Sequence, residues 1–126
     1  MAVKFLENIP IYVQISNDIK DQIIAEKLHD GDKLSSIREY SIAYEVTALT
    51  MQRALGLLEQ EGVIETKKGV GSFVRHGVRE QLKRKIVEEL VRDFIARAAN
   101  MGITGGEILN IVKEGIENEQ KHNHNQ

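Results

Sequence analysis

Two lysines, Lys67 and Lys68, stand side by side in the stretch IETKKGVGSFV, residues 64–74. Just upstream, the run from Val46 to Leu58 contains no acidic residue, and Arg53 is its single charge. Ammonium and guanidinium groups bind phosphate oxygens, and arginine and glutamine side chains match the hydrogen-bonding edges of guanine and adenine. With Gln52 beside Arg53, this part of the chain offers the chemistry to bind a nucleic acid, although the net charge of the protein is −2.

The lysine pair lies between two short apolar, strand-like runs. Gly69 and Gly71 follow the lysines, and glycine adopts the positive φ of a tight reversal without steric cost. This pattern predicts a β-hairpin over residues 63–75 with the lysines at its tip, residues 67–71.

Three helices are expected before the hairpin. The first starts near Pro10, and the tripeptide Asp30-Gly31-Asp32 interrupts it; one of its faces is apolar at Ile11, Ile15, Ile19 and Ile23. The second starts at Ser36, which forms a capping box with Glu39, and ends around Glu45; its inner face is expected at Ile37, Tyr40 and Ala43. A short turn then leads to the third helix.

The third helix is predicted over residues 47–61, with Thr47 as its N-cap and Gly62 after its end. Its core-facing residues are expected to be Met51, Ala54, Leu55 and Leu58. The opposite face would carry Leu49, Gln52, Arg53 and Gly56, which have short or uncharged side chains except for one arginine. A short helix, a tight turn and a longer helix form a helix-turn-helix, and the hairpin makes it winged.

Residues 78–119 predict two more helices. The first, residues 78–99, carries two adjacent apolar rows, which are Leu82, Ile86, Leu90 and Phe94, and Val87, Val91, Ile95 and Ala98. The second opens with Thr104 and Glu107 and continues to about Glu119, with Ile108, Leu109, Val112 and Ile116 expected inward. One helix cannot cover both rows, so we expect a second copy of the chain to bury the rest.

The expected fold class is mainly α with a small β-hairpin. The expected organisation is a winged helix-turn-helix domain over 1–76, a two-helix dimerisation element over 77–119 and a disordered tail over 120–126.

Composition limits the other function classes. The chain has 126 residues and no cysteine, and no apolar run long enough to span a bilayer, so we expect a cytoplasmic protein that does not enter a membrane. No acid–base pair, nucleophilic triad or phosphate-binding loop is present, which argues against an enzyme, and no cofactor is expected. His122 and His124 lie in the polar tail, where solvation is a better explanation than metal binding, and we expect no metal site.

The sequence resembles the GntR family of bacterial transcriptional regulators, in its short YtrA-like subfamily. The resemblance rests on IPIYVQI (9–15), GDKLSSIRE (31–39), VTALTMQRALGLLEQEGVI (46–64) and KGVGSFV (68–74). It implies a dimeric repressor, often of operons that encode membrane transporters, with double-stranded operator DNA as its partner. Because the C-terminal part is short, about 50 residues, it offers no dedicated ligand pocket, and the existence of a small-molecule effector stays open.

The resemblance also implies which residues contact DNA. LSSIREY aligns with the family motif and places Arg38 in a contact role. The start of the recognition helix corresponds to Thr47, Ala48, Leu49 and Thr50, followed by Gln52 and Arg53, and the wing-tip glycine is Gly69, preceded by Lys68. Ser35 replaces the usual proline, and Ala48 and Leu49 replace polar residues of many members, so the operator sequence does not carry over.

Three alternatives stay open for the sequence. A winged helix could bind another protein instead of DNA, and the acidic total favours this slightly, whereas the acid-free helix disfavours it. Thr47 could serve simply as a helix cap. Lys67, Lys68 and Arg53 could be ordinary solvated side chains.

Overall fold

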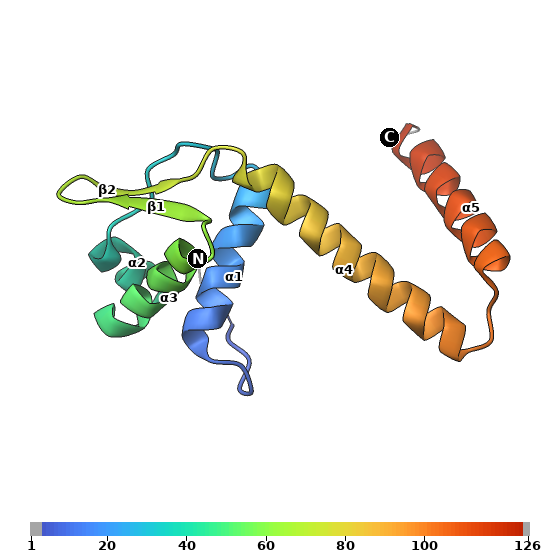
Figure 1. Ribbon diagram of the computed structural model, residues 1–126, viewed down its shortest axis with the longest axis horizontal. Helices are drawn as coiled ribbons and strands as arrows, with labels where there is room; N and C mark the ends of the chain where they lie inside the picture. Colours follow the sequence, from blue (N-terminus) through green and yellow to red (C-terminus); the bar gives the residue numbers. More distant parts are fainter. Residues whose placement is uncertain (1–3, 125–126) are drawn as a thin grey trace. The chain divides into compact units, whose positions relative to one another are not determined.

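The computed structural model describes residues 4–124, which form two compact units divided between Arg84 and Lys85 (Figure 1). The elements follow one another as α1 (Ile11–Ile24), α2 (Ile37–Tyr44), α3 (Ala48–Gln60), β1 (Ile64–Lys67), β2 (Gly71–Val74), α4 (Val78–Asn100) and α5 (Gly105–His124). This order confirms the predicted winged helix-turn-helix in the first unit. No helix within residues 4–124 combines the length and the apolar character needed to cross a membrane.

Helix α1 is the central element of the first unit. Ile15, Ile19 and Ile23 are completely buried, whereas Ile11, the first member of the predicted row, is 42% exposed. Pro10 is the N-cap, and the chain leaves the helix through Glu26, which has a φ of 60°. The apolar face of α1 packs on α3, and a continuous core joins α1, α2, α3 and the hairpin.

The two helices of the helix-turn-helix are closed by the predicted caps. Ser36 Oγ accepts a hydrogen bond from Glu39 N at 3.1 Å, and Ser36 N donates to the Glu39 carboxylate at 3.0 Å. These bonds hold the pKa of Glu39 below its usual value, the backbone amide of Ser36 being the larger cause. The inner face of α2 differs from the prediction: Tyr44 is buried and Ala43 is exposed, because residues 37, 40 and 44 follow the helical period from Ile37.

Helix α3 buries the four residues that its periodicity predicts, Met51, Ala54, Leu55 and Leu58. Strands β1 and β2 follow it and pair antiparallel, with Ile64 opposite Val74 and Lys67 opposite Gly71. A third segment lies along the free edge of β2, where Leu34 N donates to Ser72 O at 2.8 Å and Val74 N donates to Asp32 O at 2.9 Å. This segment pairs Lys33 with Phe73 and covers an edge that would otherwise offer unpaired backbone groups.

The boundary between the two units differs from the predicted boundary at residue 76. Val78 is 5% exposed in the N-terminal core, and Leu82 packs against that core, so the first turns of α4 belong to the first unit. Leu82, which was predicted to serve dimerisation, is half-buried against this core, so part of its surface already packs within its own chain.

The second unit contains the rest of α4 and all of α5. Helix α5 continues to His124, so the prediction of a disordered tail is wrong for residues 120–124, while residues 125 and 126 lie outside the described part. The segment after Glu119 contains no glycine or proline that would stop a helix. Leu109, which was expected to point inward, is 73% exposed.

Candidate nucleic-acid interface

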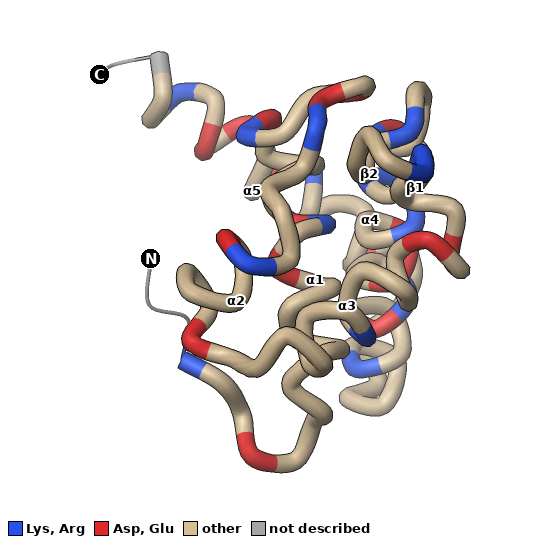
Figure 2. The backbone as a smooth tube through the Cα atoms, turned by 90° about the vertical axis from the view of Figure 1, so that its left-hand side faces the viewer, with Lys and Arg blue, Asp and Glu red and all other residues tan. Residues whose placement is uncertain are grey.

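The outer face of α3 is exposed along its length. Leu49 is 60% exposed, and Gln52, Arg53 and Gly56 are also open to solvent, while the opposite face is buried. Arg53 is the one basic residue of α3, and the acidic residues of this helix begin at Glu59. Figure 2 colours the basic and acidic positions along the backbone. A helix surface of this kind can enter a DNA groove without repulsion from acidic side chains.

The N-terminal end of α3 combines a helix cap with two neighbouring hydroxyl groups. Thr47 Oγ1 accepts a hydrogen bond from Thr50 N at 3.2 Å and lies 2.9 Å from Thr50 Oγ1. Thr47 is therefore a helix cap, and the two hydroxyl groups lie together at a helix N-terminus, where anions are favoured. Ala48 follows directly and is exposed.

Arg38 and Arg53 are exposed on α2 and α3, and neither forms an ion pair with another residue in the described part of the chain. A guanidinium group that is not neutralised within its own molecule remains available for an external anion or base edge. Both predicted arginines therefore lie where the sequence placed them, at the surface of the helix-turn-helix.

The two wing lysines have different surroundings. Lys67 is the last residue of β1, and its ammonium nitrogen lies over the Phe73 ring, 5.1 Å from the ring centroid. Lys68 and Gly69 form the turn, with Gly69 at a φ of 77°, a value that a residue with a side chain adopts only at a steric cost. Lys68 is thus the lysine at the tip, whereas Lys67 is held against the strand pair.

Sequence reasoning missed Lys33 as a neighbour of the wing. A Cβ atom at Gly71 would lie 2.7 Å from Lys33 Cε, so the lysine stem lies across the glycine and would have to move aside for a side chain there. The φ of 141° at Gly71 also favours glycine. A groove runs beside it, lined by Ser35, Ser36, Val70 and Ser72. The sequence contains no periodic pattern that pairs residue 33 with residues 71–73, so the contact could not be predicted from spacing.

Polar contacts from α1 hold both helices of the helix-turn-helix in place. Tyr44 Oη donates to Asp18 Oδ2 at 2.6 Å, and Gln22 Nε2 donates to the same carboxylate oxygen at 3.0 Å. Burial, followed by the bond to Asp18, raises the pKa of Tyr44 above its ordinary value. Glu61, the C-cap of α3, pairs with Lys20 of α1 at 2.7 Å.

The remaining dimerisation candidates lie on α4 in the second unit. Leu90 is 64% exposed, and Val87, Val91, Phe94 and Ile95 are each about half exposed, while Ile86 is half-buried. Ala98, in the same rows, is buried. On α5, Ile111 and Ile116 are also more than half exposed. The second unit therefore leaves a large apolar surface uncovered within a single chain.

Comparison with known proteins gives a consistent result. Residues 11–74 match the model of the family described as bacterial regulatory proteins, gntR family. The HTH-type transcriptional regulator YhcF of Bacillus subtilis is 33% identical over 115 residues, which cover 90% of this chain and 95% of that protein. The HTH-type transcriptional repressor YtrA of Bacillus subtilis is 30% identical over 108 residues, 83% of each chain. The solved structure of a GntR family transcriptional regulator from Listeria monocytogenes superposes with a TM-score of 0.78 at 35% identity, covering 87% of this chain and 98% of that one.

Proposed function

This chain belongs to the gntR family of bacterial regulatory proteins, and from that premise we propose that it is a homodimeric repressor that binds a palindromic DNA operator. As a family member it is a transcriptional regulator with a DNA-binding domain. What we propose beyond this is the two-fold symmetry of the operator, the dimer and the role as a repressor. Its place of action would be the cytoplasm, where the DNA is.

The observation that carries the proposal is the exposed, acid-free outer face of α3 within a winged helix-turn-helix. A recognition helix of this kind lies in the major groove with its N-terminal residues near the base edges. We assign Gln52 and Arg53 to base edges, adenine and guanine respectively, and Leu49 to a thymine methyl group. Thr47, Ala48 and Thr50 would approach the phosphate backbone at the helix N-terminus.

Arg38 and the wing would fix the protein on the duplex. Arg38 lies near the start of α2, where it can bind a backbone phosphate. Lys68 and Gly69 at the tip, with Lys67 behind them, would contact the adjacent backbone or minor groove. Lys33, which lies against β2, would add to the same positive surface. These contacts to the DNA backbone would contribute to the binding affinity, while the contacts of α3 with base edges would determine the sequence preference.

The uncovered rows of α4 support dimerisation through the second unit. An exposed apolar surface of this size is unusual for a monomer, and a two-fold partner would bury the same surface on both copies. We assign Ile86, Val87, Leu90, Val91, Phe94 and Ile95 to this interface. Two-fold symmetry would present two recognition helices to two half-sites about one helical turn apart.

The repressor role rests on the relative YtrA, whose name describes a transcriptional repressor. A dimer seated on an operator blocks access of RNA polymerase without further chemistry, which suits a chain with a short second unit. The regulated operon, with transporter genes as the family resemblance suggests, belongs to the same proposal.

Footprinting and gel-shift assays on the DNA upstream of the protein's own gene would test the proposal. We expect protection of two half-sites related by a two-fold axis, and resistance to excess unrelated competitor DNA. Equal binding to all sequences, or none, would contradict it and favour a winged helix that binds another protein.

A further inference from the structure

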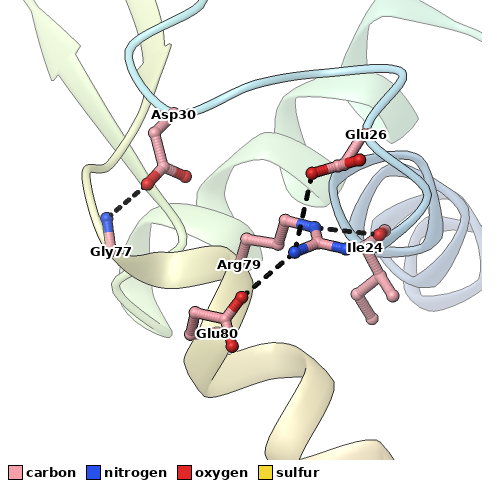
Figure 3. Close-up of polar contacts among 6 residues, drawn as sticks. All are labelled: Ile24, Glu26, Asp30, Gly77, Arg79 and Glu80. Atoms are coloured by element: carbon pink, nitrogen blue, oxygen red, sulfur yellow. Dashed lines mark hydrogen bonds and ion pairs between the residues drawn. The ribbon is translucent and has the colours of Figure 1, made fainter.

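Arg79 in the first turn of α4 reaches across to the C-terminal end of α1 (Figure 3). Its Nε donates a hydrogen bond to Ile24 O at 3.0 Å in a partly buried position. Its Nη1 lies 3.7 Å from the Glu26 carboxylate, and 3.0 Å from the carboxylate of Glu80 on its own helix. One side chain thus joins two elements that are 55 residues apart in the chain.

The guanidinium group of Arg79 lies at the C-terminal end of α1, where a cation and a hydrogen-bond donor are favourable. The last carbonyl groups of a helix have no partner within the helix, and the C-terminus carries a partial negative charge. The last turn of α1 contains no basic residue. Backbone N–H groups of residues 25–28 bond to the carbonyl groups of Asp21, Gln22 and Ile23. Arg79 supplies, from another element, a cation at this end and a hydrogen-bond donor for Ile24 O.

Two further contacts hold the chain immediately before Arg79. Gly77 N donates to Asp30 Oδ2 at 2.7 Å, and Arg75 N donates to Val63 O at 3.1 Å. These bonds and the buried side chain of Val78 fix where α4 begins. A fixed starting point still leaves the axis of a helix free to pivot, whereas a contact one residue into α4 restrains its direction.

We propose that Arg79 is a positioning residue that sets the direction in which α4 leaves α1. Because α1 packs on α3, this direction ties the first turns of α4 to the helix that carries the candidate base contacts. The consequence for DNA rests on the proposed function: in a dimer formed through α4, the direction of α4 sets the separation of the two recognition helices. Arg79 would therefore determine how strictly the protein selects the spacing between half-sites.

A distance measurement in the full-length chain tests the proposal without DNA. The chain has no cysteine, so Glu65→Cys on β1 and Lys83→Cys on α4, both exposed, can carry two spin labels. Dilution with unlabelled protein restricts electron–electron resonance to distances within one chain. We expect a narrow distance distribution in the parent and a broader one with Arg79→Ala.

Matched variants separate the contact with α1 from general effects. Glu80→Gln changes the partner on the same helix and should leave the distribution unchanged. Arg79→Lys keeps the charge but loses the guanidinium fork, so it should broaden the distribution less than Arg79→Ala. If Arg79→Ala does not fold, the comparison of Arg79→Lys with Glu80→Gln decides the question. A distribution that the Arg79 variants leave unchanged would overturn the proposal.

Binding to operators with altered spacing tests the functional consequence. Half-sites would be moved apart or together by one or two base pairs. We expect the parent's preference for the natural spacing to fall by about tenfold in Arg79→Ala, which corresponds to about 1.4 kcal/mol, while affinity for a single half-site stays the same. An unchanged preference would overturn the proposed consequence. If the parent itself selects no DNA sequence, the proposed function fails, and the distance distribution alone decides the role of Arg79.

Discussion

Thr47 and Arg53 illustrate two kinds of residue on one helix. Thr47 has a hydrogen bond within its own chain, so its hydroxyl group stabilises α3 whether or not DNA is present. Arg53 is exposed and forms no ion pair with another described residue, so folding gives no reason for its position. The candidate base contacts are therefore those side chains on α3 that the fold leaves unused.

Replacing Arg53 with alanine should weaken operator binding by about 1–3 kcal/mol and relax the base preference at one position of each half-site. The physical reason is the loss of a bidentate pair with guanine. Titration of labelled operator variants against the protein would measure both effects. Gln60→Ala, at the last position of α3, serves as the control and should bind as the parent does. Unchanged affinity and preference would remove Arg53 from the proposed role.

Tyr44→Phe should lower the free energy of unfolding by about 1–3 kcal/mol, because the Asp18 carboxylate loses a hydrogen-bond donor. The pKa of Tyr44 is raised in the folded protein, so its contribution is fully present below the pKa of the unfolded tyrosine and is lost as the pH rises beyond it. Urea unfolding from about pH 8 to about pH 11, either side of the ordinary tyrosine pKa of about 10, would measure the difference between the two proteins. A difference that grows above this pKa would contradict the assignment.

At the scale of elements, the hairpin is a three-segment structure rather than an isolated two-stranded wing. Residues 31–34 pair with β2 on the edge opposite β1, and the core residue Val74 ends that strand. A lone hairpin is marginal in water, and the third segment with its core contacts stabilises the wing. The lysine at the tip therefore projects from a three-segment support.

Replacing both Lys67 and Lys68 with alanine should weaken binding to all DNA sequences to a similar extent. Each phosphate contact that is lost should lower the log–log dependence of binding on salt concentration by about 0.9, so the pair should lower it by about 1–2 in total. Binding assays over a series of salt concentrations would measure the slope.

Since Lys67 lies against Phe73, Lys68→Ala alone should account for the larger share of the change in slope. Lys27→Ala, on the exposed loop after α1, is the control; an unaltered slope in the double variant would mean that the wing does not touch DNA.

For the whole molecule, the small negative net charge is compatible with DNA binding because the charges are unevenly distributed. Acidic residues are absent from residues 46–58, whereas α5 carries four acidic residues and two basic ones. The second unit contributes apolar surface instead of positive charge. The molecule thus separates the expected DNA contacts of the first unit from the expected partner contacts of the second.

Replacing Leu90 with aspartate should convert the proposed dimer into a folded monomer. Burying a leucine is worth about 1.5–3 kcal/mol, and a two-fold interface buries it twice, so the dimer should lose about 3–6 kcal/mol. Analytical ultracentrifugation would measure the oligomeric state, circular dichroism would verify the fold, and gel shifts should record greatly weakened operator binding. Glu89→Ala, at the neighbouring position, should remain dimeric. A dimer of undiminished stability in the Leu90 variant would contradict the proposed interface.

Sequence alone determined the elements whose caps and apolar periods depend on residues within one or two helical turns of each other. The capping box of Ser36 and Glu39, the Thr47 cap and the four buried residues of α3 depend on residues three or four positions apart, and the structure confirms each of them. The acid-free face of α3 follows from the same period. For this reason the order of elements, the fold class and the exposed face of α3 could be predicted.

Tertiary structure alone decided the contacts between segments that are distant in the chain. It placed Lys33 across Gly71, set Lys67 against Phe73 and packed Leu82 against the N-terminal core. It also brought Arg79 to the end of α1. Helical and strand periods define which face of an element is apolar, but they do not define which partner covers it. That choice is made by the packing of all elements together, because each buried face and each unpaired carbonyl group must find its partner at the same time.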